Sequence, residues 1–324
     1  MESSLIIYPG FAVVCLTFLL YTKNRIEVGK AFSEKSIKGS YLKFYQDKPP
    51  EHVEISRQTL KNQFELPVLF YFLITSSTLF CQKLDEVING DHRSAKNKAR
   101  DIYRNPLKTL QFFGLKNDMT VIELNPGGGW YQEILAPFLN AKGQYISATA
   151  DPNSDNERTR NAYLREKKRL DSNKKLYSNA KMVPLNGTIY GEESSADMIL
   201  SFRNYHNWIG SSEFEKLRAV YKTLKPGGVF GITDHRSSTT IDAKGYTCEP
   251  CLIKDVEAVG LVYVGASQIN ANPKDTKDHP GGVWNLPPTL SERGLEKSDI
   301  TKSQKRFKEI GESDRYTLKF VKPK

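Results

Sequence analysis

Short apolar runs alternate with helix-patterned segments after residue 100, and each run is bounded by glycine, proline or an acid. Runs of this length between turn residues are typical of buried strands. We expect strands at residues 121–124, 143–151, 181–187, 196–202 and 229–234. Helical spacing, end signals or composition mark the segments 106–114, 130–140, 153–180 and 214–224. This alternation predicts an α/β fold, a doubly wound sheet with helices on both faces.

The first part of the chain has a different pattern. Leu5–Tyr21 and Leu66–Cys81 are almost uninterrupted apolar runs, each near the lower limit of roughly 17 residues for a bilayer-spanning helix, so we expect a pair of short membrane helices. A secretory signal peptide is the alternative for the first run. Glu2 is the only charge before that run and basic residues follow it, which favours an uncleaved anchor. The basic linker between the runs favours a cytoplasmic loop, with both chain ends on the other side of the membrane.

A glycine-rich turn follows the first expected strand of the sheet, in Val121-Ile-Glu-Leu-Asn-Pro-Gly-Gly-Gly129. Glycine lets a ligand lie against the backbone and permits positive φ. Gln132 stands where a dinucleotide fingerprint has its third glycine, so that fingerprint is incomplete. The second strand ends at Asp151, whose carboxylate suits the two hydroxyls of a ribose. A plain turn residue before Pro152 is the alternative.

The spacing Glu123-x-x-x-Gly127-x-Gly129 resembles the first motif of class I methyltransferases, which bind S-adenosylmethionine on a Rossmann-like sheet. Leu224-Lys-Pro-Gly-Gly228 resembles a second hallmark of these enzymes, at the expected place in the chain. The resemblance covers residues 84–324 and implies S-adenosyl-L-methionine as cofactor. It implies cofactor contacts from Glu123, Asn125, Gly127, Gly129, Asp151, Asn186 and Arg203. Asn186, just past the third strand, takes the position that meets the adenine amino group in this family.

Polar residues follow the fourth expected strand, in Arg203-Asn-Tyr-His-Asn-Trp208. In class I methyltransferases, which the chain resembles, the end of this strand lies beside the reactive methyl group of the cofactor. Asn204 and His206 are therefore candidates for orienting the acceptor or taking its proton. A neutral imidazole can act as general base near pH 7, although a structural histidine that caps the next helix is the alternative for His206. His235, after the fifth strand, is the second candidate for catalysis. The tetrapeptide of amino-methyltransferases, which contains two prolines and an aromatic residue, is absent after the fourth expected strand. Its absence counts against methylation of an exocyclic amine of a nucleic-acid base.

The last third of the chain resembles a narrower group of predicted bacterial methyltransferases in Asp234-His-Arg236, in residues 272–288 and in residues 311–321. This resemblance implies no particular substrate. A polar, aromatic-walled pocket over the strand ends would be lined by His235, Arg236, His279 and Trp284. The alternative is that these residues only fix loops. The closing segment, Tyr316–Val321, has the alternation of an edge strand and would complete the antiparallel pair typical of the fold.

Before the second apolar run, Arg57-Gln-Thr-Leu-Lys-Asn62-Gln-Phe-Glu65-Leu-Pro67 resembles the second-helix signature of the MAPEG family, membrane-associated proteins of eicosanoid and glutathione metabolism. The resemblance implies that Arg57, Asn62 and Glu65 help to form a glutathione site. Proteins of that family have four helices per subunit, whereas this segment offers two, so a polar boundary to an anchoring helix is the interpretation that we favour. The expected domains are a partial MAPEG-like membrane segment, residues 1–83, and a class I methyltransferase domain, residues 84–324.

Composition limits the choice of partners only weakly. A net charge of +10 and a pI near 9.2 permit contact with anionic partners such as nucleic acid or lipid headgroups. The basic segment 153–180 has few interleaved aromatic residues, so we expect a solvated helix face and no nucleic-acid site. Cys248 and Cys251 form a single CxxC, for which a plain loop is favoured over a redox disulfide or a metal site. We expect no metal centre.

Three functions remain open from the sequence. The favoured one is a membrane-anchored methyltransferase that uses S-adenosylmethionine and acts on a small-molecule or lipid-like acceptor, with its domain on the cytoplasmic or the periplasmic side. The second is a non-catalytic cofactor-binding or membrane-assembly protein. The third is a glutathione-dependent membrane enzyme, which needs a partner to supply the missing helices, so association through the membrane helices is also open. A nicotinamide oxidoreductase fits least well, because Gln132 interrupts the dinucleotide fingerprint.

Overall fold

The computed structural model describes residues 4–35, 49–55, 58–59, 84–186, 188–239 and 244–324. Contacts divide the chain into two units, Met1–Gln82 and Lys83–Lys324. In the first unit, the helix α1 (Ser4–Ser33) includes the first predicted apolar helix and continues beyond it. Among the described residues, no helix combines the length and the apolar character needed to cross a membrane. The second predicted membrane helix, with Arg57, Asn62 and Glu65 of the MAPEG-like signature, lies outside the described residues.

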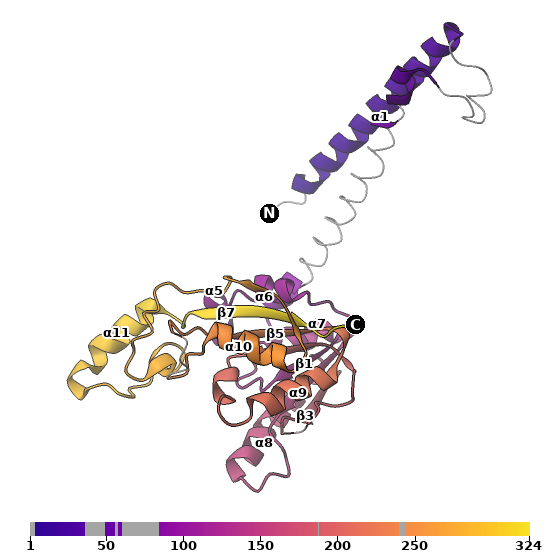
Figure 1. The fold of residues 1–324 in the computed structure, drawn as a ribbon. Helices are drawn as coiled ribbons and strands as arrows, with labels where there is room; N and C mark the ends of the chain where they lie inside the picture. The colour runs from indigo at the N-terminus through magenta and orange to yellow at the C-terminus, as the bar shows by residue number, and fades with distance from the viewer. Residues whose placement is uncertain (1–3, 36–48, 56–57, 60–83, 187, 240–243) are drawn as a thin grey trace. The chain divides into compact units, whose positions relative to one another are not determined.

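The second unit is built on a seven-stranded sheet in the order β3-β2-β1-β4-β5-β7-β6 (Figure 1). Neighbouring strands are parallel, except that β7 runs antiparallel to β5 and β6. Five strands match the predicted apolar runs: β1 (Thr120–Leu124), β2 (Gln144–Thr149), β3 (Ala180–Pro184), β4 (Ala196–Phe202) and β5 (Leu224–His235). The strands β6 (Val262–Ser267) and β7 (Arg315–Val321) complete a mixed, Rossmann-like α/β sheet, which confirms the α/β part of the predicted fold but not its pair of membrane helices.

Helices cover both faces of this sheet (Figure 1). On one face, α9 (Glu213–Thr223) and α10 (Glu249–Ala258) contribute Leu217 and Leu252 to a fully buried apolar core with Ile122 and Phe230. The opposite face carries α6 (Pro106–Phe113), α7 (Gln132–Leu139) and α8 (Glu157–Ser172). The remaining helical elements are α4 (Ala95–Lys98), α5 (Asp101–Arg104), η1 (Tyr205–Asn207), η2 (Gly282–Asn285), η3 (Lys297–Asp299) and α11 (Ile300–Ile310).

The prediction that Tyr316–Val321 forms an edge strand is wrong. The strand β7 lies between β5 and β6, and its side chains are buried on both faces: Tyr316, Leu318 and Phe320 join the apolar core, while Thr317 is buried on the other face. The edge strand is β6, where Val262 and Val264 are more than half exposed. An alternating pattern fits any strand with one polar face, so it cannot distinguish an edge from an interior position.

The segment Leu224-Lys-Pro-Gly-Gly228, the second motif that resembles methyltransferases, is part of a strand. Helix α9 already ends at Thr223, and the five residues form the first part of β5. Gly227 adopts a φ of 79°, and the adjoining backbone bonds to Lys322, whose carbonyl accepts from Gly227 N at 2.8 Å while its own N–H donates to Gly228 O at 2.9 Å. The turn therefore serves to pair β5 with the end of the chain, and its glycine provides the positive φ that this pairing requires.

Candidate functional site

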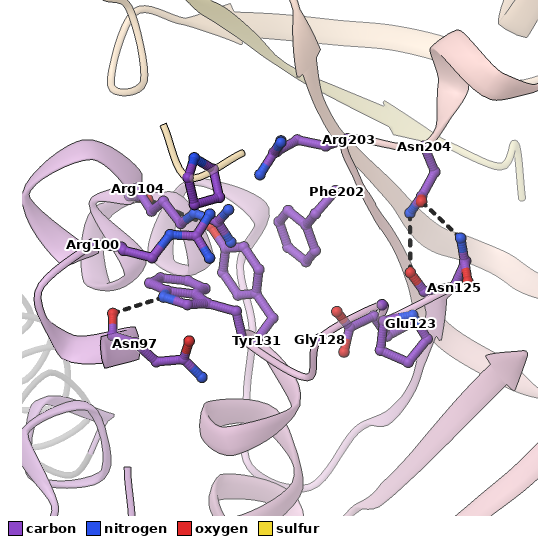
Figure 2. Close-up of a pocket in the computed structure, with 14 residues that line it drawn as sticks. Asn97, Arg100, Arg104, Glu123, Asn125, Gly128, Tyr131, Phe202, Arg203 and Asn204 are labelled. Carbon is purple, nitrogen blue, oxygen red and sulfur yellow. Dashed lines mark hydrogen bonds between the residues drawn. The ribbon is translucent and has the colours of Figure 1, made fainter. Parts of the chain in front are cut away.

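The strand order reverses between β1 and β4, because the chain leaves β1 toward β2 and leaves β4 in the opposite direction toward β5. In open α/β sheets, ligands bind at the carboxyl ends of the strands at such a switch point. A cavity of about 290 Å³ lies there, and we call it the switch-point cavity (Figure 2). It is lined by Asn97, Arg100, Arg104, Glu123, Asn125, Pro126, Gly127, Gly128, Trp130, Tyr131, Phe202, Arg203, Asn204 and Pro288.

The glycine-rich turn owes its shape to three left-handed residues, Asn125, Gly127 and Gly129, with φ values of 48°, 59° and 78°. Asn125 N–H donates to the carbonyl of Ala148 on β2 at 2.7 Å, which holds the start of the turn against the neighbouring strand. A side chain at Gly128 would meet no atom within 4 Å, so the backbone of the turn is open to an approaching ligand. Glycine is favoured at 127 for its φ, because left-handed geometry costs roughly 1–2 kcal/mol for most residues with a Cβ.

A buried polar network supports this turn from the α8 side. Gln132, which replaces the third glycine of a dinucleotide fingerprint, donates from Nε2 to Glu166 Oε1 at 2.6 Å, and Ser147 Oγ donates to the same oxygen at 2.7 Å. Arg169 pairs with Glu166 Oε2 at 2.7 Å and donates from Nη2 to the carbonyl of Gly127 at 2.8 Å. The basic helix is therefore more than the solvated face predicted for it, since one of its arginines fixes the ligand-facing turn.

Glu123, predicted to contact the cofactor, lines the cavity at the end of β1 and is only 2% exposed. Its Oε2 accepts a hydrogen bond from Tyr145 Oη at 2.7 Å. Burial raises the pKa of the Glu123 carboxyl from 4.5 to about 8, an effect that outweighs the opposing hydrogen bond from Tyr145. The carboxyl group is thus mostly protonated at neutral pH, until a cation or a stronger donor enters the cavity.

Asp151 and Asn186 lie outside the switch-point cavity but next to each other, after the ends of β2 and β3. Asn186 Nδ2 donates to Asp151 Oδ2 at 2.8 Å, and the other carboxylate oxygen accepts from Asn153 N–H at 2.8 Å. The backbone joins the two strand ends as well, because Leu185 N–H donates to the Thr149 carbonyl at 2.6 Å. The predicted ribose and adenine residues therefore form one polar pair, one and two strands away from β1.

Asn204 has a structural contact that the sequence does not reveal. Its Nδ2 donates to the Leu124 carbonyl at 2.8 Å. Its Oδ1 accepts from Asn125 Nδ2 at 3.1 Å, a bond that is drawn in Figure 2. The side chain is 5% exposed and links the ends of β1 and β4 beneath the turn. Arg203, which precedes it with a φ of 61°, lines the cavity and donates from Nε to His235 Nε2 at 3.3 Å.

The two predicted catalytic histidines lie beside Asp234 and do not line the cavity. His206 Nδ1 is 2.9 Å from Asp234 Oδ1, so the carboxylate orients the ring with its proton on Nδ1 and leaves Nε2 as an acceptor. His235 is fully buried, and burial together with the charge of Arg203 lowers its pKa well below the usual value. Since its Nε2 accepts from Arg203, its Nδ1 carries the proton and donates to Ser313 Oγ. His235 is therefore a neutral, fixed group, and only His206 has a nitrogen suited to accept a proton.

The same three residues offer ligand atoms within 4.8 Å of one another, which is close enough for a metal ion. Hydrogen bonds already use these atoms, since Asp234 bonds to His206 and His235 Nε2 accepts from a guanidinium. The charges of Arg203, Arg315 and Arg104 act on His235 and oppose a further cation.

Of the other predicted pocket residues, only Trp284 approaches this group, with its ring centre 6.2 Å from that of His206. Arg236 pairs with Glu249 at 2.9 Å, and His279 is buried with its Nε2 2.9 Å from Asp275. These two fix loops, as the alternative interpretation predicts.

The favoured interpretation of Cys248 and Cys251 as a plain loop is wrong, because the two form a disulfide at the start of α10. Cys248 is the N-cap of that helix, and its Sγ accepts from the Cys251 N–H at 3.2 Å. A CxxC pair at a helix start brings the two residues within bonding distance, with Cα atoms 5.2 Å apart.

Several residues of the cavity wall are absent from the sequence-based site. Trp130 and Tyr131 directly follow the glycines and Phe202 ends β4, so their positions at the strand ends could have indicated them. Arg100 and Arg104 come from a polar, charged segment before the sheet, at the start and end of α5. Their spacing of four residues, one helical turn, is the only signal that they share a face.

No protein-family model and no curated protein matches the chain. Among solved structures, it resembles an S-adenosylmethionine-dependent methyltransferase from Aquifex aeolicus, with 14% identity, a TM-score of 0.44 and coverage of 74% of this chain and 97% of that one. It also resembles the [4+2]-cyclase SpnF, at 14% identity and a TM-score of 0.46 over 72% of this chain and 85% of that one. The N-methyltransferase NodS from Bradyrhizobium japonicum matches at 13% identity and a TM-score of 0.41, over 70% and 97% of the two chains. At these values the likeness carries no conclusion about activity.

Proposed function

We propose that residues 84–324 form an S-adenosylmethionine-dependent methyltransferase domain that acts on a small-molecule acceptor. The observation that carries the proposal is the open glycine turn at the switch point between β1 and β4, which meets a cavity on one side. On the other side, the Asp151–Asn186 pair follows β2 and β3. A turn that presents bare backbone between a cavity and a carboxylate suits an extended ligand that has a ribose in its middle.

The residues present fit this cofactor. Gly127 and Gly128 leave room for a ligand against the backbone, Glu123 and Asn125 offer oxygen acceptors in the cavity, and Asp151 offers a carboxylate for ribose hydroxyls. When bound, S-adenosylmethionine supplies an electrophilic methyl group on a sulfonium. The protein must then orient the acceptor, exclude water and remove a proton where the nucleophile carries one. His206, oriented by Asp234, is the residue that we assign to proton removal.

Calorimetric titration of the full chain with S-adenosylmethionine and with its demethylated product tests the proposal. We expect micromolar binding that Gly127→Val abolishes and Asp151→Ala weakens at least tenfold. Gly191→Val is the matched control, because Gly191 also has a positive φ (103°) and open space around it but lies in the exposed loop before β4. A folded chain that binds neither compound, or a Gly127→Val variant that binds as tightly as Gly191→Val, would sink the cofactor assignment.

We further propose that the first unit anchors this domain at a membrane, which would give it access to lipid-like acceptors. The support comes from the sequence alone, in the apolar run Leu5–Tyr21 followed by basic residues, since no described helix is long and apolar enough to cross a membrane. Fractionation of cells that express the full chain, with a carbonate wash of the membranes, tests this. Recovery of the washed chain in the supernatant would contradict the anchor, whereas retention in the pellet that is lost without residues 1–83 would support it.

A further inference from the structure

We propose that the methyl acceptor carries an anionic oxygen group, a carboxylate or a phosphate, which binds the guanidinium groups of Arg100, Arg104 and Arg203 in the switch-point cavity. The proposal rests on the methyltransferase function above and names the class of its acceptor. In Figure 2, the three side chains approach one another from two sides of the cavity, above the rings of Tyr131 and Phe202.

The charges around this cavity do not balance. Glu312, only 2% exposed, serves three arginines: its carboxylate lies 2.6 Å from Arg100 Nε, 3.1 Å from Arg104 Nε and 3.2 Å from Arg315 Nη1. Arg203 is a fourth cation, and no described carboxylate lies within ion-pair distance of it. Glu312 and, less strongly, Asp234 act on Arg203 through their charges, but Glu312 already bonds to three other arginines and Asp234 accepts from His206. Four guanidinium groups thus share one dedicated carboxylate.

Hydrogen-bonding capacity is left over as well. Among the described residues, Arg100 Nη2 is buried and has no acceptor, and Arg203 donates only from Nε, to a neutral histidine. Burial lowers the pKa of Arg104 to about 9 and that of Arg203 to about 10, because desolvation disfavours the charged form. Buried cations without a counter-ion cost free energy, and a carboxylate or phosphate that accepts two bonds from a guanidinium fork offsets that cost.

The cofactor alone cannot supply the missing charge. Its single carboxylate is accompanied by an ammonium and a sulfonium, so binding it adds net positive charge to a site that is already positive. An anionic acceptor would balance the arginines and the sulfonium together, and its binding would depend on both. Electrostatics therefore favours the acceptor as the source of the anion.

The floor of the cavity indicates what the anionic group is attached to. Tyr131 stacks on Phe202 with ring centres 3.5 Å apart, Trp130 meets Tyr131 edge-on at 4.5 Å, and Arg104 lies over the Trp130 ring at 4.8 Å. Flat aromatic surfaces beneath a cationic rim suit a small acceptor with an apolar or planar body and an anionic end.

Anion titrations of the full chain test the proposal, with the demethylated cofactor both present at saturation and absent. The probes are benzoate, its uncharged analogue benzamide, and inorganic phosphate, so that carboxylate and phosphate are separate arms. Arg203→Gln is the main variant, because Arg203 has no described ion pair to lose. Arg203→Lys keeps the charge without the fork, and Arg158→Gln removes an exposed arginine on α8 as the control.

We expect saturable binding of benzoate or phosphate but not of benzamide, weakened at least tenfold by Arg203→Gln, less by Arg203→Lys, and unchanged in Arg158→Gln. Cofactor affinity should stay within threefold in all three variants, which separates this role of Arg203 from the cofactor contact that the methyltransferase resemblance implies for it. The inference is overturned if no anion binds saturably, or if Arg203→Gln binds anions as tightly as the wild type does. It is also overturned if Arg203→Gln loses as much affinity for the cofactor as for anions, since the arginines would then bind the cofactor. Absence of cofactor binding to the wild type would instead refute the proposed function, and the titrations without cofactor would still report on the arginines.

Discussion

The buried carboxyl of Glu123 gives the fold a pH dependence that can be measured. Its folded pKa of about 8 lies well above the ordinary value of 4.5, because burial disfavours the ionised form. Between these two pH values the native state keeps a proton that the unfolded chain releases, so stability is fully present below pH 4.5 and is lost as pH rises through 8. The slope for one proton is about 1.4 kcal/mol per pH unit, so the wild type should lose about 2 kcal/mol from this group between roughly pH 6 and pH 8.

The substitution Glu123→Gln removes this titration but keeps the shape of the side chain and an oxygen that can accept from Tyr145. Urea denaturation followed by tryptophan fluorescence, at several pH values in that range, gives the free energy of unfolding for both proteins. From roughly pH 6 to pH 8, we expect the free energy of unfolding of Glu123→Gln to rise by about 2 kcal/mol relative to that of the wild type, whatever the difference between the two proteins at the lower pH. Glu257→Gln, an exposed position on α10, is the control and should run parallel to the wild type.

A constant difference between Glu123→Gln and the wild type, to within about 0.5 kcal/mol over the same range, would refute the reasoning. It would mean that the carboxyl group is ionised in the native state and therefore solvated or paired with a cation. The opposite slope, with the wild type gaining on the variant as pH rises, would mean that the native state favours the carboxylate.

Three further predictions concern stability. Burial alone would raise the pKa of Glu312, but the charges of the surrounding arginines hold it at about 2. Glu312→Gln should therefore lower the free energy of unfolding by about 3–5 kcal/mol near neutral pH, measured by guanidinium denaturation. The difference from the wild type should shrink as pH falls below 4.5, because the unfolded chain then takes up a proton that the native carboxylate does not bind. Gly231→Ala should lower the melting temperature by several degrees, because its Cβ would lie 2.8 Å from the Phe113 ring; an unchanged melting temperature would mean that α6 can move away. Cys248→Ser should lower the free energy of unfolding by about 2 kcal/mol or less, the loop-closure contribution of a four-residue ring. In reductant, the wild type should be as stable as the variant. If reductant destabilises the variant as much as the wild type, Cys248 is not bonded to Cys251.

Much of the sheet follows from local sequence. The strands β1 to β5 are short apolar runs between turn residues, and their order along the chain makes parallel pairing with crossover helices the natural solution. The place of β7 is a non-local property. Thr317 and Lys319 look solvent-facing in the sequence, but Thr317 is buried beneath Asn270, which donates to its hydroxyl at 2.9 Å, and that contact joins segments 47 residues apart.

The candidate site divides in the same way. Glu123, Asn125 and Gly127 are predictable because a turn of this composition must lie at a strand end, and the structure places all three around the cavity. The positions of Arg100 and Arg104 in the cavity wall are not predictable, since these residues reach the cavity only through the fold of the backbone before the sheet. Their counter-ion Glu312 lies 212 residues after Arg100 and 208 residues after Arg104 in the chain.

The link between α8 and the glycine turn makes the ligand-facing backbone depend on a helix that has little else to hold it. Glu166 is the only buried residue of α8, and the rest of its contact with the turn passes through Arg169 and Gln132. A segment with few buried apolar contacts opens at a cost well below that of global unfolding. Opening of α8 would release the Gly127 carbonyl, so ligand binding at the turn is coupled to local unfolding of this helix. The observed ligand affinity would then include the free energy of closing α8, and hydrogen exchange of α8 amides should slow when a ligand occupies the turn.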